Sequence, residues 1–243
     1  MNRDHKLAIL HMLVFSAILG VYLRSTKDIK WVETGLHDIE MSERDITTKL
    51  IVETPQQAFF IILIAFPFIT AMFHFFRATG KMDGRTWRFV EYSITSTLML
   101  YLLGQSCNVL CFDTMLMILS VNFTLMLLGI IIQRLLSKGD VENAKLLTGI
   151  GWLLFVIAWV PLYRSFYNAV SKLPDIPGIP SKRTFNILFY SLITMYASFG
   201  FVQLLEVFQV MSRETAGVSY DLLSLTTKST LVGIVAGGFF NRR

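Results

Sequence analysis

Long apolar runs separated by short polar stretches extend through the whole chain. Seven of the runs reach the roughly 20 apolar residues that a membrane-spanning helix needs. Because most of the polar stretches between them are short, consecutive helices should pack antiparallel as neighbours. The pattern predicts an all-α membrane protein folded as a single domain over residues 1–243, with helices over residues 7–24, 56–77, 86–106, 112–136, 145–170, 185–211 and 217–240.

The connection over residues 25–55 has a different pattern. Residues 31–34 and 46–53 are typical of two short strands, because they contain alternating β-branched residues. They predict a β-hairpin that lies on the membrane surface. An odd number of spanning helices also places the two termini on opposite sides of the membrane.

The composition excludes a soluble domain. Of the 243 residues, 53% are hydrophobic and 16% are charged, which is too apolar for a wettable surface. The net charge of +5 is spread over loops and tails, so it suits lipid headgroups better than nucleic acid. Lys and Arg are nearly balanced between the two sides, so they do not give the orientation. Cys107 and Cys111 cannot by themselves complete a structural zinc site, and we expect no metal site.

The last apolar run carries Lys228 at its midpoint. Placing an ionised lysine at the centre of a spanning helix costs roughly 2.5 to 3.5 kcal/mol, so such a residue is normally paired, solvated or chemically modified. Burial favours the neutral amine, which is the form that attacks aldehydes to give Schiff bases. The alternative is a structural membrane subunit, in which a buried carboxylate neutralises the lysine and holds helices together.

The expected carboxylate partner of Lys228 is Glu91. The helices that carry the two residues begin on the same side, so at a rise of 1.5 Å per residue Glu91 lies about 7 Å deep and Lys228 about 16 Å deep. A lysine side chain leans toward the amino terminus of its helix and spans about 6 Å, which brings its nitrogen toward the carboxylate. The alternative for Glu91 is a side chain that extends to water at the level of the headgroups.

Further polar side chains are expected around this pair. Ser224 lies four residues before Lys228 on the same helical face, where its hydroxyl can bond the nitrogen, its counterion or its own backbone. Histidines titrate in a range suited to storing a proton, although an intramembrane histidine is more often a packing residue. The residues that can line a common polar cavity are Tyr92, Thr95, Ser96, His11 and His74.

Aromatic residues recur at helical spacing in the fifth and sixth predicted helices. They can form the wall of a site for a flat apolar ligand, although such residues usually belong to the core. The candidates are Trp152, Phe155, Trp159, Tyr196 and Phe199. The chain has no His-Glu-x-x-His, Gly-x-Ser-x-Gly or Gly-x-Gly-x-x-Gly motif, so we expect no enzymatic activity.

Two segments carry a resemblance to a known family. Arg88-Phe-Val-Glu91-Tyr92-Ser-Ile-Thr-Ser96-Thr-Leu-Met and Ser224-Leu-Thr-Thr-Lys228 resemble the third- and seventh-helix signatures of the heliorhodopsins. These are retinal-binding seven-helix photoreceptors, inverted in the membrane relative to the microbial pumps. The resemblance covers essentially the whole chain, with further matches at Leu-His11-Met-Leu, Ala-Met-Phe-His74-Phe, Asn122, Gly129 and Gln203.

The resemblance implies a light-sensing photoreceptor of rhodopsin-like fold that signals through a photocycle. It implies that Lys228 forms the Schiff base with retinal, expected as the all-trans isomer, that Glu91 is the counterion and that Ser224 is its hydrogen-bonding neighbour. His11 and His74 would lie in a hydrated cavity. The resemblance further implies a homodimer with a cytoplasmic amino terminus, and a retinal pocket that includes Asn122, Leu125, Met126, Gly129 and Gln203.

Glu206 lies three residues after Gln203, where we expect a neutral residue in the family. A carboxylate inside a spanning helix is costly when ionised, and proton relays are a leading reason for keeping one. Glu206 therefore keeps a second function open, light-activated proton transport through Glu91, the polar cavity and Glu206. The alternative is a protonated or surface-directed glutamate that faces Gln203 or Arg213.

Overall fold

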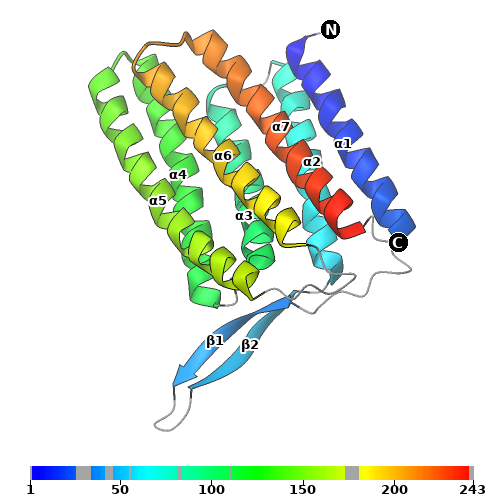
Figure 1. Cartoon of the computed structure of the whole chain (residues 1–243). Coiled ribbons are helices and arrows are strands. Elements are labelled where there is room, and N and C mark those ends of the chain that lie inside the picture. Colours follow the sequence, from blue (N-terminus) through cyan, green and yellow to red (C-terminus); the bar gives the residue numbers. More distant parts are fainter. Residues whose placement is uncertain are drawn as a thin grey trace.

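The computed structural model describes residues 2–25, 34–41, 46–54, 56–80, 84–109, 111–172 and 181–240 (Figure 1). Within these ranges the chain forms seven helices and one pair of strands. In chain order they are α1 (Arg3–Ser25), β1 (Thr34–Met41), β2 (Ile46–Thr54), α2 (Gln56–Ala78), α3 (Thr86–Ser106), α4 (Phe112–Ser137), α5 (Val141–Ser171), α6 (Lys182–Val207) and α7 (Arg213–Phe240).

The helices form one bundle in which each packs against the next in sequence. Contacts between α1 and α7 close the ring, and α2 also touches α7. Figure 1 shows the amino terminus at one end of the bundle and the carboxyl terminus at the other. The fold is therefore the predicted seven-helix bundle, with α1, α2, α3 and α7 adjacent around its interior.

The two strands pair antiparallel, in a register that runs from Thr34 opposite Thr54 to Met41 opposite Ile46. Figure 1 shows them beyond the end of the bundle at which α4 begins. The sequence placed the first strand at residues 31–34, of which only Thr34 is described, whereas β1 begins there and continues to Met41. Of the connection over residues 25–55 that was predicted to form the surface hairpin, residues 26–33, 42–45 and 55 lie outside the described residues.

Several helices begin or end at polar residues outside the predicted apolar spans. At the start of α5, Asp140 accepts a hydrogen bond from the backbone N–H of Asn143, and at the start of α6 Ser181 accepts one from Thr184. These side chains satisfy amide groups that lack helical partners, so the helices start a turn before the apolar run. The sequence extended the sixth helix to residue 211, but α6 ends at Val207, because Gln209 has a φ of 59°, which breaks the helix.

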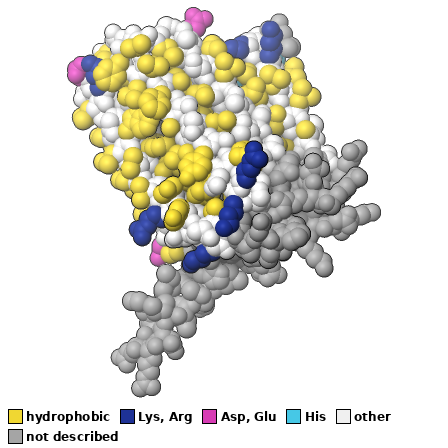
Figure 2. Space-filling model, viewed as in Figure 1, with side chains coloured by type: hydrophobic (Ala, Val, Ile, Leu, Met, Phe, Trp, Pro, Cys, Tyr) yellow, Lys and Arg dark blue, Asp and Glu magenta, His cyan; other side chains and the backbone are white. Residues whose placement is uncertain are grey.

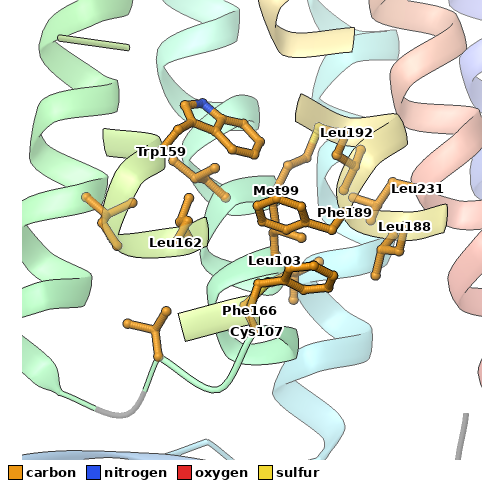
Figure 3. Packing of buried hydrophobic residues seen from close by; sticks show 14 of the residues in the cluster. Met99, Leu103, Cys107, Trp159, Leu162, Phe166, Leu188, Phe189, Leu192 and Leu231 are labelled. Carbon is orange, nitrogen blue, oxygen red and sulfur yellow. The ribbon is translucent and has the colours of Figure 1, made fainter. Parts of the chain in front are cut away.

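The apolar core fills the half of the bundle in which α3 ends and α6 begins. Figure 3 shows Trp159, Leu162 and Phe166 of α5 facing Leu188, Phe189 and Leu192 of α6 and side chains of α3. The rings of Phe166 and Phe189 stack with centroids 4.1 Å apart. Cys107 is buried in the same cluster as a small apolar residue. Most of the buried charged residues lie toward the other end of the bundle, where α3 and α7 begin.

The outer surface is strongly apolar. Figure 2 shows hydrophobic side chains spread over one face of the bundle, with acidic side chains near its ends. Four described helices are long and apolar enough to cross a membrane: α2 over Ile61–Ala78, and α4, α5 and α6 over their whole lengths. The remaining helices, α1, α3 and α7, are the ones that carry most of the buried charged and titratable residues.

Candidate functional site

The side chain of Lys228, on α7, ends among three oxygen atoms in the middle of the bundle. Its Nζ donates hydrogen bonds to Glu91 Oε1 at 2.6 Å, to Thr70 Oγ1 at 2.5 Å and to Ser224 Oγ at 2.8 Å. An ammonium group has three donors, so this arrangement satisfies it completely. Lys228 is only 3% exposed and Glu91 only 2%. The site is therefore a fully buried ion pair.

Glu91, on α3, is held by hydroxyl groups as well as by the lysine. Its Oε1 accepts hydrogen bonds from Thr70 Oγ1 at 2.5 Å and from Thr95 Oγ1 at 3.2 Å. A buried charge is tolerated when its partners supply such bonds. Thr70 is a site residue that the sequence reasoning missed. The available signal was its position four residues before His74, which places both on one face of α2.

An apolar pocket opens beside the lysine and is lined by α3, α4, α5, α6 and α7. Its wall is mainly apolar and includes seven aromatic side chains, with a few hydroxyl and amide groups, as in sites for small apolar ligands. Tyr92 and Phe199 pack edge to face in this wall, with centroids 5.3 Å apart. The predicted residues that line it are Tyr92, Ser96, Leu125, Met126, Trp152, Tyr196, Phe199, Gln203, Ser224 and Lys228.

Two predicted pocket residues lie outside the lining and support the residues that form it. The amide of Asn122 donates to Ser96 Oγ at 3.0 Å and to Thr97 Oγ1 at 3.1 Å, so it ties α4 to α3. Gly129 leaves space for the ring of Phe89, because a Cβ at this position would lie 2.2 Å from Phe89 Cδ1. Trp159, predicted in the aromatic wall, packs instead in the apolar core against Tyr196.

Further lining residues were not singled out from the sequence. They repeat the spacing of the predicted ones along each helix, so a search for residues three, four or seven positions away would have found most of them. They are Phe89, Met99, Thr148, Gly151, Ala197, Gly200, Tyr220 and Thr227. The predicted Thr95 and Phe155 line the pocket with them.

The two predicted histidines lie together between α1 and α2. The rings of His11 and His74 stack with centroids 5.4 Å apart, and His74 Nδ1 lies 3.2 Å from Asp4 Oδ1. Neither ring nitrogen of the fully buried His11 has a hydrogen-bond partner among the described residues. Such buried polar atoms are normally satisfied by water, so this region suits a small hydrated cavity.

Glu206 lies in a different part of the bundle from the histidines. It is 4% exposed, and its Oε2 accepts a hydrogen bond from Gln133 Nε2 of α4 at 2.8 Å. The sequence offered Gln203 or Arg213 as partners. The observed hydrogen-bond partner comes from a neighbouring helix, while Arg213 interacts with Glu206 electrostatically. The structure thus brings together Lys228, Glu91 and Ser224, and it brings together His11 and His74 separately. Glu206 lies apart from both groups, on the side of α6 that contacts α4.

The residues of this site fit a retinal molecule. A primary amine at the end of a pocket is what covalent attachment of an aldehyde requires. The aromatic wall suits a flat apolar chain, and Gly151 and Gly200 of the lining keep side chains out of its path. Trp152 Nε1 and Gln203 Nε2 are buried at the wall without a hydrogen-bond partner in the described part of the chain.

A protein-family model described as Heliorhodopsin matches residues 4–240. The chain belongs to the heliorhodopsin family. A search of curated protein sequences found no significant match. Heliorhodopsins are retinal-binding, light-responsive membrane proteins and in general not enzymes, so the chain is an integral membrane protein of this kind.

Solved structures resemble this heliorhodopsin in fold. The transmembrane domain and linker of a rhodopsin phosphodiesterase from Salpingoeca rosetta aligns with a TM-score of 0.72 at 12% identity, covering 98% of this chain and 72% of that one. Cyanorhodopsin from a Tolypothrix cyanobacterium aligns with a TM-score of 0.71 at 12% identity, covering 97% and 94%. Halorhodopsin, a light-driven chloride pump, aligns with a TM-score of 0.67 at 12% identity, covering 96% and 92%. These likenesses establish the rhodopsin fold.

Proposed function

We propose that this heliorhodopsin is a light sensor that holds all-trans retinal through Lys228, with Glu91 as the counterion, and that it signals through a photocycle. The observation that carries the proposal is the 2.6 Å hydrogen bond from Lys228 Nζ to Glu91 Oε1 beside the aromatic pocket. A lysine kept only for structural pairing needs no adjoining pocket, so the site favours a photoreceptor over a structural subunit.

When bound, retinal supplies the absorption of visible light and the isomerisation that follows. The chain's own residues set the conditions for both. Glu91 supplies the negative charge that stabilises a protonated nitrogen on Lys228. Thr70 and Ser224 fix the direction of that nitrogen through hydrogen bonds of 2.5 and 2.8 Å. The aromatic wall binds the apolar chain and excludes water from the reactive end.

Movement of the Lys228 nitrogen would transmit a structural change from the pocket to the rest of the bundle. Glu91 Oε1 is the acceptor for a proton that leaves this nitrogen, since it lies 2.6 Å away. Transfer of the proton would neutralise both groups and weaken the bonds from Thr70 and Thr95. Because these residues lie on α2, α3 and α7, the change would repack three helices, which is a form of output that a partner can detect.

Reconstitution tests the proposal directly. Purified protein incubated with all-trans retinal should acquire a visible absorption band that hydroxylamine bleaches. Extraction of the pigment in the dark and chromatography of the products identifies the bound isomer. A protein that stays colourless, although correctly folded by circular dichroism, would contradict the proposal and favour a structural role for the buried pair.

Light-activated proton transport is a second candidate function, favoured by one observation. Glu206 is a buried carboxyl group that accepts a hydrogen bond from the neutral amide of Gln133. Buried carboxyl groups inside a membrane protein are common members of proton relays. The path in this candidate runs from Glu91 through the polar cavity to Glu206, and voltage-clamp recording in illuminated cells distinguishes it from sensing alone.

We also propose that the protein works as a homodimer in the lipid bilayer, with its single seven-helix domain oriented so that the amino terminus is cytoplasmic. Exposed apolar side chains on α4 and α5, among them Phe123, Ile131, Leu153 and Val160, supply surface for lipid and for a second copy. Light scattering of the detergent-solubilised protein tests the dimer. Accessibility of a terminal tag in intact cells tests the orientation.

A further inference from the structure

Asp221, one turn of α7 before Ser224, is surrounded by arginines. Its Oδ1 lies 3.3 Å from both Nε and Nη2 of Arg88 and 3.3 Å from Nη1 of Arg77. Its Oδ2 lies 3.3 Å from Nη2 of Arg3. Asp221 is 2% exposed, and Arg88 is 4% exposed. A second buried ionic cluster therefore lies two turns of α7 from Lys228, and neither light absorption nor retinal binding accounts for it.

Arg88 forms its ion pair in this cluster with Asp221, and Glu206 is a second carboxylate near enough to interact with it electrostatically. The other carboxylate of the cluster, Asp4, pairs with Arg77 at 3.1 Å and with His74 at 3.2 Å. Among the described residues, Arg88 forms its ion pair with Asp221 and donates a further hydrogen bond to the backbone carbonyl of Gly217. Buried guanidinium groups require a carboxylate or comparable acceptor. Without Asp221, Arg88 would need a new anionic partner.

The alternative partner nearest in sequence is the proposed counterion. Arg88 and Glu91 are three residues apart on α3, a spacing at which side chains of opposite charge meet on one face of a helix. The contacts of Arg88 are instead with α7, and they include the ring of Tyr220, 5.3 Å from the guanidinium carbon. Glu91 is left to Lys228 and its hydroxyl neighbours.

We propose that Asp221 is a positioning residue for the Lys228–Glu91 pair, which holds Arg88 against α7 and so prevents it from competing with Lys228 for Glu91. The proposal rests on the proposed function insofar as Glu91 is the counterion. It also applies to the retinal-free protein, in which Lys228 keeps a free amine that can pair with Glu91 directly. This role differs from that of a reserve counterion, since Asp221 acts on the pair through Arg88 in addition to the electrostatic interaction of its own charge with Lys228.

The test compares Asp221→Asn, Arg88→Gln and the double variant in two measurements. The first is the infrared carboxylate band of Glu91 in retinal-free protein, assigned by difference with Glu91→Gln. The second is the visible maximum after reconstitution with retinal. Asp221→Asn should shift the infrared band and move the visible maximum to longer wavelength, because Arg88 then weakens the interaction of Glu91 with the nitrogen. Arg88→Gln and the double variant should resemble the wild type in both.

The matched control is Asp4→Asn, which removes the other carboxylate of the cluster without touching Arg88 and should leave the Glu91 band in place. An unchanged band in Asp221→Asn would overturn the proposal, as would a double variant that keeps the shift. If Asp221→Asn does not fold, the proposal is tested by Arg88→Gln and the double variant. A shift of the Glu91 band in either would contradict an Arg88 that is held against α7 and does not interact with Glu91. A wild-type protein that forms no pigment refutes the proposed function, whereas the infrared comparison still tests Asp221.

Discussion

The side-chain nitrogen of Lys228 lies 2.6 Å from Oε1 of Glu91, although the two residues are 137 positions apart in the chain. Both side chains are buried, so bulk water solvates neither charge. Their pairing depends on α3 and α7 facing each other across the interior of the bundle. The consequences of this single contact for colour and stability can be measured in separate variants.

Replacing Lys228 with alanine should yield a colourless protein that still inserts into the membrane. Covalent attachment of retinal requires a primary amine at this position, and no other lysine lines the described pocket. Absorption spectroscopy after incubation with retinal, with membrane fractionation to verify insertion, checks the prediction. A visible pigment with retinal still covalently attached would assign the attachment site to another lysine.

Replacing Glu91 with glutamine should move the midpoint of the pH titration of the visible band to lower pH and shift its maximum. Loss of the negative charge removes the stabilisation of a protonated nitrogen at Lys228. In the retinal-free protein the same change leaves a buried ammonium without its carboxylate, which costs about 3 to 5 kcal/mol of stability. Glu91→Asp, which keeps the charge, is the control. An unchanged titration in Glu91→Gln would identify another carboxylate as the counterion, with Asp221 the next candidate.

Replacing Thr70 with valine should change the visible band in the same direction as Glu91→Gln, but less. Valine has the same shape and lacks the hydroxyl that bridges Lys228 Nζ and Glu91 Oε1 at 2.5 Å on each side. Each hydrogen bond to a charged group contributes roughly 1.5 to 3 kcal/mol. Ser224→Ala should act similarly through its one bond to Lys228. Thr70→Ser restores the hydroxyl and should restore the spectrum, and a Thr70→Val pigment identical to wild type would remove Thr70 from the site.

The pairing of Lys228 with Glu91 could be predicted because it depends on quantities that a sequence contains. The rise per residue gives the depth of each side chain, and the lean of the lysine toward its helix start closes the remaining distance. The helix ends were less predictable. Polar residues such as Asp140 and Ser181 belong to no apolar run, yet their side chains cap the first turn of a helix.

Contacts that depend on how one helix is rotated against another could not be predicted. The sequence places Thr70 on the same face of α2 as His74, but it does not show that this face turns toward Glu91 of α3 and Lys228 of α7. Trp159 has the same spacing as Trp152 and Phe155, but it lies deeper along α5 and packs in the core. Periodicity identifies the face of a helix on which a residue lies, whereas the neighbouring helices decide what that face touches.

Replacing Gly129 with alanine should weaken retinal binding and destabilise the protein. A methyl group at this position would lie 2.2 Å from Phe89 Cδ1, and Phe89 lines the pocket. Overpacking of this kind costs roughly 1 to 3 kcal/mol. The matched control is Gly149→Ala on α5, where a Cβ meets nothing within 4 Å. Gly149→Ala should leave the melting temperature unchanged or raise it, because alanine favours the helix over glycine by about 1 kcal/mol. Equal melting temperatures and retinal uptake in both variants would contradict the close approach of Gly129 to Phe89.

Replacing Glu206 with glutamine separates proton transport from sensing. If light evokes a current in voltage-clamped cells that express the protein, protons should carry it and Glu206→Gln should greatly reduce it. The carboxyl group bonded to Gln133 can accept and release a proton inside the bundle, whereas an amide in its place can do neither. Glu142→Gln, at an exposed glutamate, is the control and should leave the current unchanged. A proton current that persists in Glu206→Gln would remove this residue from the path. The absence of current in the wild type, with a normal visible band, would favour a sensory role in which Glu206 and Gln133 join α4 to α6.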